Sequence, residues 1–245
     1  MPPYSSCDLT QDLQSLQVEA GDILFVHSSF KSLGPVEGGA DSVIQALEAA
    51  IGPGGLLLMP SFNLITWESR PKTWDLDNTP STVGWITERF RQLPGVYRSD
   101  HCSHSVAARG RGAKAFVDGH LRQEGYSSQW ECKPWGKTYG LHSPMYRAYQ
   151  ARGKLLMLGV DYYTSTYVHL VETMFWHTLR AKRGDTEREP GFPALDRVKL
   201  GAFWERSGEL ERGSVGDADC RLFQICSYVD TLLAEVERNP RPYLR

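Results

Sequence analysis

Residues 21–34, GDILFVHSSFKSLG, place a continuous apolar run directly before a polar loop that ends in glycine. Two more apolar runs also follow a glycine, GLLLMP at 55–60 and GKLLMLGV at 153–160. Short continuous apolar runs are typical of strands that are buried on both faces, as in a mostly parallel sheet. The three runs therefore predict the centre of such a sheet.

The segment between the first two runs has a helical pattern. Residues 38–51, GGADSVIQALEAAI, place four apolar side chains on one helical face. Asp41 is the expected N-cap, and Gly52-Pro53 is a normal helix stop. The pattern predicts a strand–helix–strand unit.

Elements of the same kind continue along the chain. Further helices are expected at about 81–93 and 166–179, with a peripheral amphipathic helix at about 220–236. Residues 126–149 are rich in aromatic residues, Gly and Pro, which predicts a long ordered loop. No linker divides the chain. We therefore predict one α/β domain over residues 1–245, with a central mixed, mostly parallel sheet flanked by helices.

Composition excludes several classes of protein. The chain has 245 residues and a net charge of -2, without the basic excess of a nucleic-acid-binding protein. No apolar run approaches the ~18–20 residues of a membrane helix, and the N-terminus has no secretory pattern. The five cysteines are odd in number and scattered, which is typical of reduced thiols. We expect a cytoplasmic protein that binds neither nucleic acid nor membrane.

The loop that follows the first predicted strand is the first candidate binding segment. Residues 27–34 lie between a buried strand and a helix, where open α/β sheets bind ligands. A helix N-terminus offers free N–H groups to an anion such as a pyrophosphate, and Lys31 would add a cation. An ordinary turn-rich loop explains the segment equally well, because it matches no standard phosphate-binding motif.

The segment RSDHCSHS at 98–105 is the second candidate. Two histidines and a cysteine within it suggest a metal, but no matching ligand pair stands elsewhere in the chain, so we expect no metal site. A polar turn that positions ligand contacts is the preferred functional interpretation. A solvated loop is the alternative.

The third candidate is the segment DYYTSTYVHLVE at 161–172. On a helix, His169 and Glu172 lie on the same face, where the carboxylate can orient the imidazole of a general base. Residues 164–166 would supply the helix cap. One alternative is that both side chains simply face solvent. Another is that the pair is half of a carboxylate–histidine metal site, but such a site needs a second E-x-x-H motif, which the sequence lacks.

These pieces occur in an order that resembles the aminoglycoside 3-N-acetyltransferase family, which belongs to the antibiotic N-acetyltransferases outside the GNAT class. The matching stretches cover most of the chain between Gly21 and Cys220: GDILFVHSSFKSLGPVEGGADSVIQAL, GPGGLLLMPSFN, NTPSTVGWITERFRQLPGVYRSDHCSHSVAARGRGA, YGLHSPMYRA, GKLLMLGVDYYTSTYVHLVE and GSVGDADC. The resemblance implies a single α/β domain, acetyl-CoA as co-substrate and a small-molecule amine as acceptor. It leaves a homodimer open.

The resemblance also implies roles for particular residues. The catalytic group would be His169 as general base, with Glu172 and Asp161. Acceptor contacts would come from Asp75, Thr166 and Trp135. Acetyl-CoA would be held by two loops, at His27, Ser28, Ser29, Lys31, Ser32, Gly34 and Val36, and at His104, Ser105 and Val106.

The chain also departs from its relatives. His101-Cys102 stands where the family usually has His-Pro. The aromatic stretch at 130–135 does not align with the resistance enzymes of the family, and it is followed at 173–177 by the bulky apolar sequence TMFWH. We expect both places to contact the acceptor. Three hypotheses remain. The acceptor is an aminoglycoside, acetylated at its 3-amino group, or it is another amino sugar, nucleotide-linked ones included. Otherwise the chain binds CoA without catalysis, against which the intact His169 and Glu172 argue.

Overall fold

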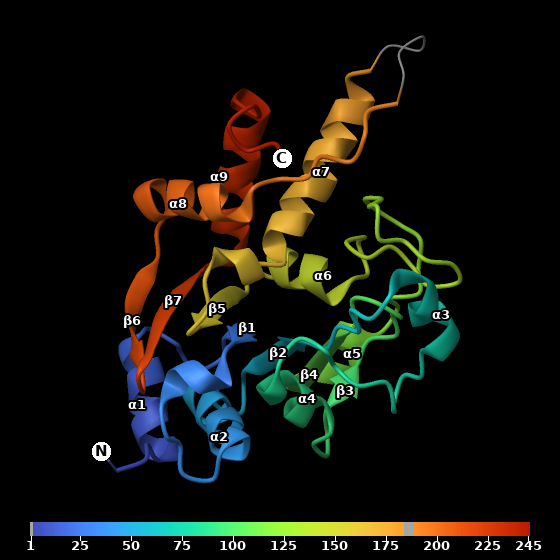
Figure 1. Cartoon of the computed structure of the whole chain (residues 1–245). Helices are drawn as coiled ribbons and strands as arrows, with labels where there is room; N and C mark the ends of the chain where they lie inside the picture. The colour runs from blue at the N-terminus through green and yellow to red at the C-terminus, as the bar shows by residue number, and fades with distance from the viewer. Residues whose placement is uncertain (1, 184–188) are drawn as a thin grey trace.

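A seven-stranded sheet forms the centre of the computed structural model, which describes residues 2–183 and 189–245. Figure 1 shows the sheet running through the molecule, with helices on both faces. In spatial order the strands are β3 (Tyr97–Arg98), β4 (Val106–Gly110), β2 (Leu56–Pro60), β1 (Ile23–Ser28), β5 (Lys154–Leu158), β7 (Ala218–Gln224) and β6 (Glu211–Val215).

The three predicted apolar runs are confirmed as β2, β1 and β5 at the middle of this sheet. β1 pairs in parallel with β2 on one side and with β5 on the other. Helices cover both faces of the sheet here, so Leu24, Phe25 and Val26 are fully buried. Burial on both faces explains why these strands are continuously apolar.

The expectation of a mostly parallel sheet is wrong. The sheet is mixed, as predicted, but the other four strand pairs are antiparallel: β2–β4, β3–β4, β5–β7 and β6–β7. β6 and β7 form a tight hairpin that turns at Gly216, where φ is +55°. A hairpin of two consecutive strands has to be antiparallel, whereas a parallel pair needs a long crossover.

Alternate residues of the central strands face two separate cores. Leu24 and Val26 pack in the core that also holds helices α1 (Ser6–Ser15), α2 (Ala40–Ile51) and α4 (Trp85–Arg91). Phe25 packs in the core on the opposite face. That face is covered by α5 (Ala113–Val117), α6 (Pro144–Gln150), α7 (Tyr167–Ala181), α8 (Arg197–Ser207) and α9 (Ile225–Arg238).

Several predicted helix boundaries are corrected. Gly39, not Asp41, caps α2, and the Asp41 carboxylate instead binds the Arg89 guanidinium of α4 through two hydrogen bonds of 2.6 and 2.9 Å. The helix expected at 81–93 is shorter, because α4 covers only 85–91. The expected loop ends at Ser143, whose hydroxyl caps α6.

The last predicted helix is a strand followed by a helix. Residues 220–224 belong to β7, and α9 begins only at Ile225. α9 is also not peripheral, since Tyr228 and Leu232 are fully buried against α7 and α8. The alternating burial of β7 marks a strand, and period-two burial is a different pattern from that of a helix.

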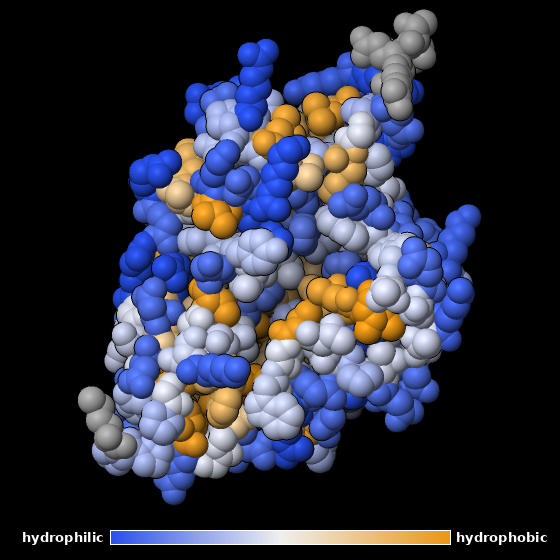
Figure 2. Space-filling model, in the orientation of Figure 1, coloured by the Kyte–Doolittle hydropathy of each residue, from blue (hydrophilic) through white to orange (hydrophobic). Residues whose placement is uncertain are grey.

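Four short elements lie in the connections between the strands and the longer helices. They are η1 (Phe30–Leu33), η2 (Trp67–Ser69), α3 (Arg70–Thr73) and η3 (Tyr162–Thr164). Figure 2 shows that apolar colour on this face is confined to separate patches among hydrophilic residues. Within the described residues, no helix is long and apolar enough to cross a membrane.

Candidate active site

A cavity of about 360 Å³ opens at the carboxyl ends of the parallel strands. The end of β1 contributes His27 and Ser28, the end of β2 contributes Pro60, and the loop after β5 contributes Val160. The other lining residues are Phe62, Leu64, Val83, Thr87, His104, Tyr163, Thr164, Thr166, His169 and Arg197. The cavity therefore brings together residues from all three candidate segments of the sequence.

A histidine–carboxylate pair borders this cavity. His169 lies in the first turn of α7, and its Nδ1 is 2.6 Å from Glu172 Oε2. The other oxygen, Oε1, accepts a 2.7 Å hydrogen bond from the Leu195 backbone N–H. Glu172 is 3% exposed, so the alternative of a solvent-facing pair is wrong. Because the carboxylate holds Nδ1, Nε2 is the ring nitrogen left for a ligand.

Thr166 joins the start of α7 to the end of β1. Its side chain does not cap the helix, contrary to the expectation for residues 164–166. Instead, Thr166 Oγ1 lies 3.1 Å from His27 Nε2, and the Thr166 carbonyl accepts a 3.3 Å hydrogen bond from the Tyr139 hydroxyl. These contacts fix the first turn of α7, and with it His169, relative to the sheet.

The segment 98–105 is buried, which excludes the alternative of a solvated loop. His101, Ser103 and Ser105 are fully buried, and His104 is nearly so. His101 Nδ1 accepts hydrogen bonds from the backbone N–H groups of Ser103 and His104 at 3.2 and 3.1 Å. The segment is thus a tight polar turn that presents His104 to the cavity.

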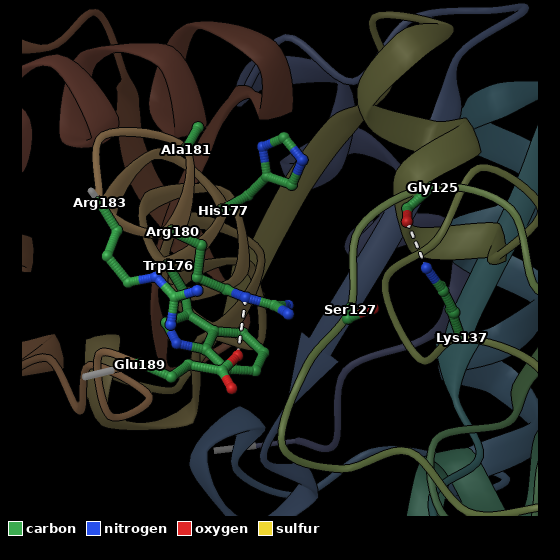
Figure 3. Close-up of a pocket in the computed structure, with 9 residues that line it drawn as sticks. All are labelled: Gly125, Ser127, Lys137, Trp176, His177, Arg180, Ala181, Arg183 and Glu189. Atoms are coloured by element: carbon green, nitrogen blue, oxygen red, sulfur yellow. Dashed lines mark hydrogen bonds and ion pairs between the residues drawn. The ribbon is translucent and has the colours of Figure 1, made fainter. Parts of the chain in front are cut away.

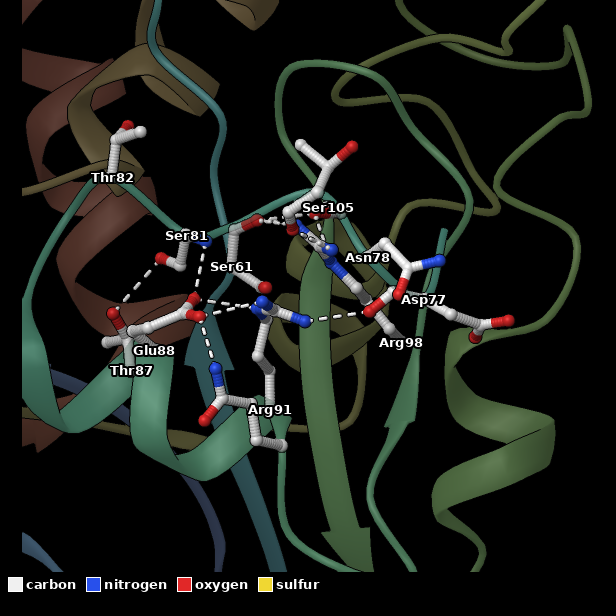
Figure 4. Close-up of polar contacts among 12 residues, drawn as sticks. Ser61, Asp77, Asn78, Ser81, Thr82, Thr87, Glu88, Arg91, Arg98 and Ser105 are labelled. Carbon is white, nitrogen blue, oxygen red and sulfur yellow. Dashed lines mark hydrogen bonds and ion pairs between the residues drawn. The ribbon is translucent and has the colours of Figure 1, made fainter. Parts of the chain in front are cut away.

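Arg98, the first residue of this segment, ties the turn to neighbouring segments through hydrogen bonds (Figure 4). Its guanidinium donates to Ser105 Oγ at 3.0 Å and to the Ser61 carbonyl at 2.7 Å. It also donates to the carbonyls of Leu76 and Thr79. Burial lowers the pKa of Arg98 to about 10, and in the described part of the chain no carboxylate forms an ion pair with it. Sequence analysis did not single out Arg98, because its partners are mostly backbone carbonyls from distant segments.

Burial lowers the pKa values of two histidines of the cavity, His27 and His104. Burial, with a smaller contribution from His169, lowers the pKa of His27 to about 3. The pKa of His104 is likewise far below its usual value, mainly through burial. Two buried polar atoms of the lining, Ser28 Oγ and His104 Nδ1, have no hydrogen-bond partner among the residues that the structure describes. Unpartnered buried polar atoms in a cavity are expected where a ligand supplies the partner.

Aromatic side chains pack against His169. The indole of Trp130 lies edge-on to the His169 ring at 4.5 Å between centroids, and it also contacts Phe192 at 5.1 Å and His104 at 5.8 Å. The sequence places this aromatic stretch near the acceptor, but it predicts the contact at Trp135 and not at Trp130. Spacing alone did not indicate that Trp130, and not Trp135, packs against His169.

Residues of the first predicted loop line two different cavities. His27 and Ser28 line the cavity, while Ser29 and Ser32 line an adjoining one of about 560 Å³, together with Asp161. Ser32 Oγ also contacts Ser29 Oγ and the Gly159 carbonyl, both at 2.9 Å. Val160 and Thr164 line both cavities, so the two lie side by side along the loop after β5.

The other predicted residues of this loop lie away from both cavities. Lys31 is exposed. Gly34 has φ of +75° and is packed so closely against the Asp217 carboxylate that a side chain would clash. Val36 forms a bridge with Tyr4 near the N-terminus. Outside this loop, Asp161, a predicted catalytic residue, lines the adjoining cavity but not the one at His169, and it accepts a 3.0 Å hydrogen bond from the Tyr163 backbone N–H.

Two of the predicted acceptor contacts, Asp75 and Trp135, form hydrogen bonds away from the cavity at His169. The Asp75 carboxylate accepts hydrogen bonds from the backbone N–H groups of Asp77 and Asn78 in its own turn. The Trp135 indole N–H donates to Asp100 at 2.9 Å. Neither residue lines the cavity at His169, whereas Thr166 does. Ser105 and Val106 lie at the start of β4, behind His104.

A second cavity, of about 490 Å³, lies between the end of α7 and residues 125–137 (Figure 3). Two of its cations already have partners: Arg180 forms a 2.9 Å ion pair with Glu189, and Lys137 donates to the Gly125 carbonyl. None of the predicted site residues lines it. In the described part of the chain, no three His, Cys, Asp or Glu side chains are grouped as metal ligands.

The comparisons with known proteins agree on one family. The family model for aminoglycoside 3-N-acetyltransferase matches residues 25–237. The chain is 31% identical to aminoglycoside N(3)-acetyltransferase IV from a Salmonella species, over 98% of this chain and 90% of that protein.

Solved structures share the fold. A mutant of AAC(3)-IVa in complex with a gentamicin superposes with a TM-score of 0.79 at 27% identity, covering 100% of this chain and 93% of that one. AAC-IIIb with CoASH superposes with a TM-score of 0.77, covering 97% of each chain, and its 22% identity shows a likeness of fold alone.

Proposed function

Because the chain belongs to the aminoglycoside 3-N-acetyltransferase family, we propose that it transfers the acetyl group of acetyl-CoA directly to an amine of a sugar-like acceptor. The single observation that carries this proposal is the His169–Glu172 pair at the edge of a cavity lined by both candidate CoA loops.

In the proposed reaction, His169 acts as the general base. Nδ1 carries the proton that is shared with Glu172, so Nε2 can accept a proton from the attacking amine. The amine nitrogen forms a bond to the thioester carbonyl carbon, and the carbon–sulfur bond breaks. The departing thiolate then takes a proton from the imidazolium. Glu172 stabilises that imidazolium because it is buried, charged and already oriented by Leu195.

The cavity fits the thioester end of acetyl-CoA. A thioester and its neighbouring amides carry hydrogen-bond acceptors and donors, and Ser28 Oγ and His104 Nδ1 are buried atoms without a protein partner. The Ser28 hydroxyl is the candidate donor to the carbonyl oxygen, whose negative charge grows as the amine attacks. Phe62, Leu64 and Val83 supply apolar surface for the pantetheine chain.

Aminoglycosides are the first acceptors to test, since the relatives are named for them. Another amino sugar, including a nucleotide-linked one, is the second candidate. The Arg197 guanidinium in the lining favours it, because guanidinium groups bind phosphate.

Turnover of a His169→Ala variant tests the proposal. Loss of a general base typically costs on the order of 10²–10⁴-fold, so kcat should fall within that range while the melting curve and CoA affinity stay near wild type. His177→Ala is the matched control, because His177 lies on the same helix and lines the second cavity. A folded His169→Ala protein with wild-type kcat would place the base elsewhere.

A further inference from the structure

Arg197 is a cation of the cavity at His169 that no candidate segment of the sequence contains. It is the first residue of α8, it is half-buried, and its guanidinium stacks over the Tyr163 ring at 4.4 Å. Both residues line the cavity. Its positive charge also opposes the rise in pKa that burial causes in the hydroxyl groups of Tyr139 and Tyr228.

Within the described residues, no carboxylate lies within ion-pair distance of Arg197. The neighbouring Asp196 caps α8 through the backbone N–H groups of Val198 and Lys199. Its closest cations are Lys199 and Arg245, each at 4.0 Å. Asp196 therefore does not neutralise Arg197.

The rest of the described lining also offers no negative charge. It consists of apolar side chains, hydroxyl groups and three histidines, together with Arg197. A half-buried guanidinium has lost part of its hydration and gains most from an anion that accepts several of its N–H groups. Stacking on Tyr163 holds the guanidinium in place before any ligand binds, which reduces the entropy lost on binding.

We propose that Arg197 is the anion-binding residue of this cavity and holds a phosphate group of a substrate. This inference rests on the proposed function for the identity of the substrates, because acetyl-CoA carries phosphates and so does a nucleotide-linked amino sugar. The sequence suggested Lys31 for this task, but Lys31 is exposed and lines neither cavity, whereas Arg197 lies at the site.

Binding measurements on Arg197→Ala and Arg197→Gln test this proposal without turnover. Lys199→Ala is the control, because it removes a cation of the same helix that lies outside the cavity. Pyrophosphate, CoA and pantetheine are titrated into each folded protein by calorimetry. Loss of charge-assisted hydrogen bonds predicts an affinity for pyrophosphate lower by about 10-fold to 100-fold in both Arg197 variants and unchanged in the control.

Two further arms identify the source of the phosphate. If CoA loses the same factor while pantetheine binds as before, the phosphate belongs to the donor. If CoA is unaffected and the KM for a uridine-diphosphate-linked amino sugar rises, it belongs to the acceptor. Wild-type affinity of both Arg197 variants for pyrophosphate, CoA and that sugar overturns the proposal. Failure of wild-type protein to bind CoA, with Arg197-dependent binding of pyrophosphate, refutes the proposed function and leaves the anion site standing.

Discussion

Replacing Glu172 with Gln should lower kcat about 100-fold with little loss of stability. The carboxylate uses one oxygen for the Leu195 N–H and the other for His169 Nδ1, so both of its partners are donors. Glutamine has only one oxygen at this end, and its NH₂ group must face one of the two donors. The substitution therefore conserves volume but not hydrogen bonding.

Either orientation of the amide impairs the base. With its oxygen toward Leu195, the NH₂ group faces His169 Nδ1, which must then be unprotonated, and the ring proton moves to Nε2. With its oxygen toward His169, the NH₂ group faces a buried N–H, at a cost of about 1–3 kcal/mol. Loss of the charge-assisted bond to the imidazolium costs a similar amount. Only this second loss changes kcat, because the imidazolium forms during the reaction, and about 2.7 kcal/mol of it corresponds to a 100-fold fall in rate.

The assay is kcat at saturating acetyl-CoA, with thiol release as the readout and a thermal melt as the check on folding. Glu235→Gln is the matched control, because Glu235 is also a buried glutamate of a helix but binds Tyr243 and Arg238 far from the cavity. The His169→Ala/Glu172→Gln double variant should be no slower than His169→Ala, because the two residues act as a unit. A Glu172→Gln protein that keeps kcat within about threefold of wild type would refute this reasoning.

Two further predictions concern stability. Gly201→Ala should destabilise the protein by about 1–3 kcal/mol although alanine favours helices, because its Cβ would lie 2.2 Å from Tyr162 Cγ; Gly191→Ala, in open space, should be neutral. Urea denaturation of both variants measures the difference, and a stabilised Gly201→Ala would contradict the packing. Stability should also fall as the pH drops below about 6.5, because the folded pKa values of His27 (about 3) and His101 (about 4) are depressed and only the unfolded chain then binds protons. The slope is up to about 1.4 kcal/mol per pH unit for each histidine, and a constant Tm between pH 7 and pH 5 would show that these rings are not held neutral by burial.

The centre of the fold and the His169–Glu172 pair could be predicted from the sequence. Residues 23–28, 56–60 and 154–158 are read as buried strands because complete burial makes a strand continuously apolar. His169 and Glu172 share a face because they are three residues apart on a helix, and this spacing holds wherever the helix lies. These features depend only on neighbours in the chain.

Only the tertiary structure decided the rest, because it depends on contacts between distant segments. Contacts made on folding set the antiparallel pairing of β7 with β5 and the burial of the 98–105 turn. They also decide that Trp130, and not Trp135, packs against His169. Arg197 enters the cavity from a different helix than His169, with no motif around it. Local periodicity carries no information on contacts between distant segments, whereas these contacts can be read from burial and charge in the folded molecule.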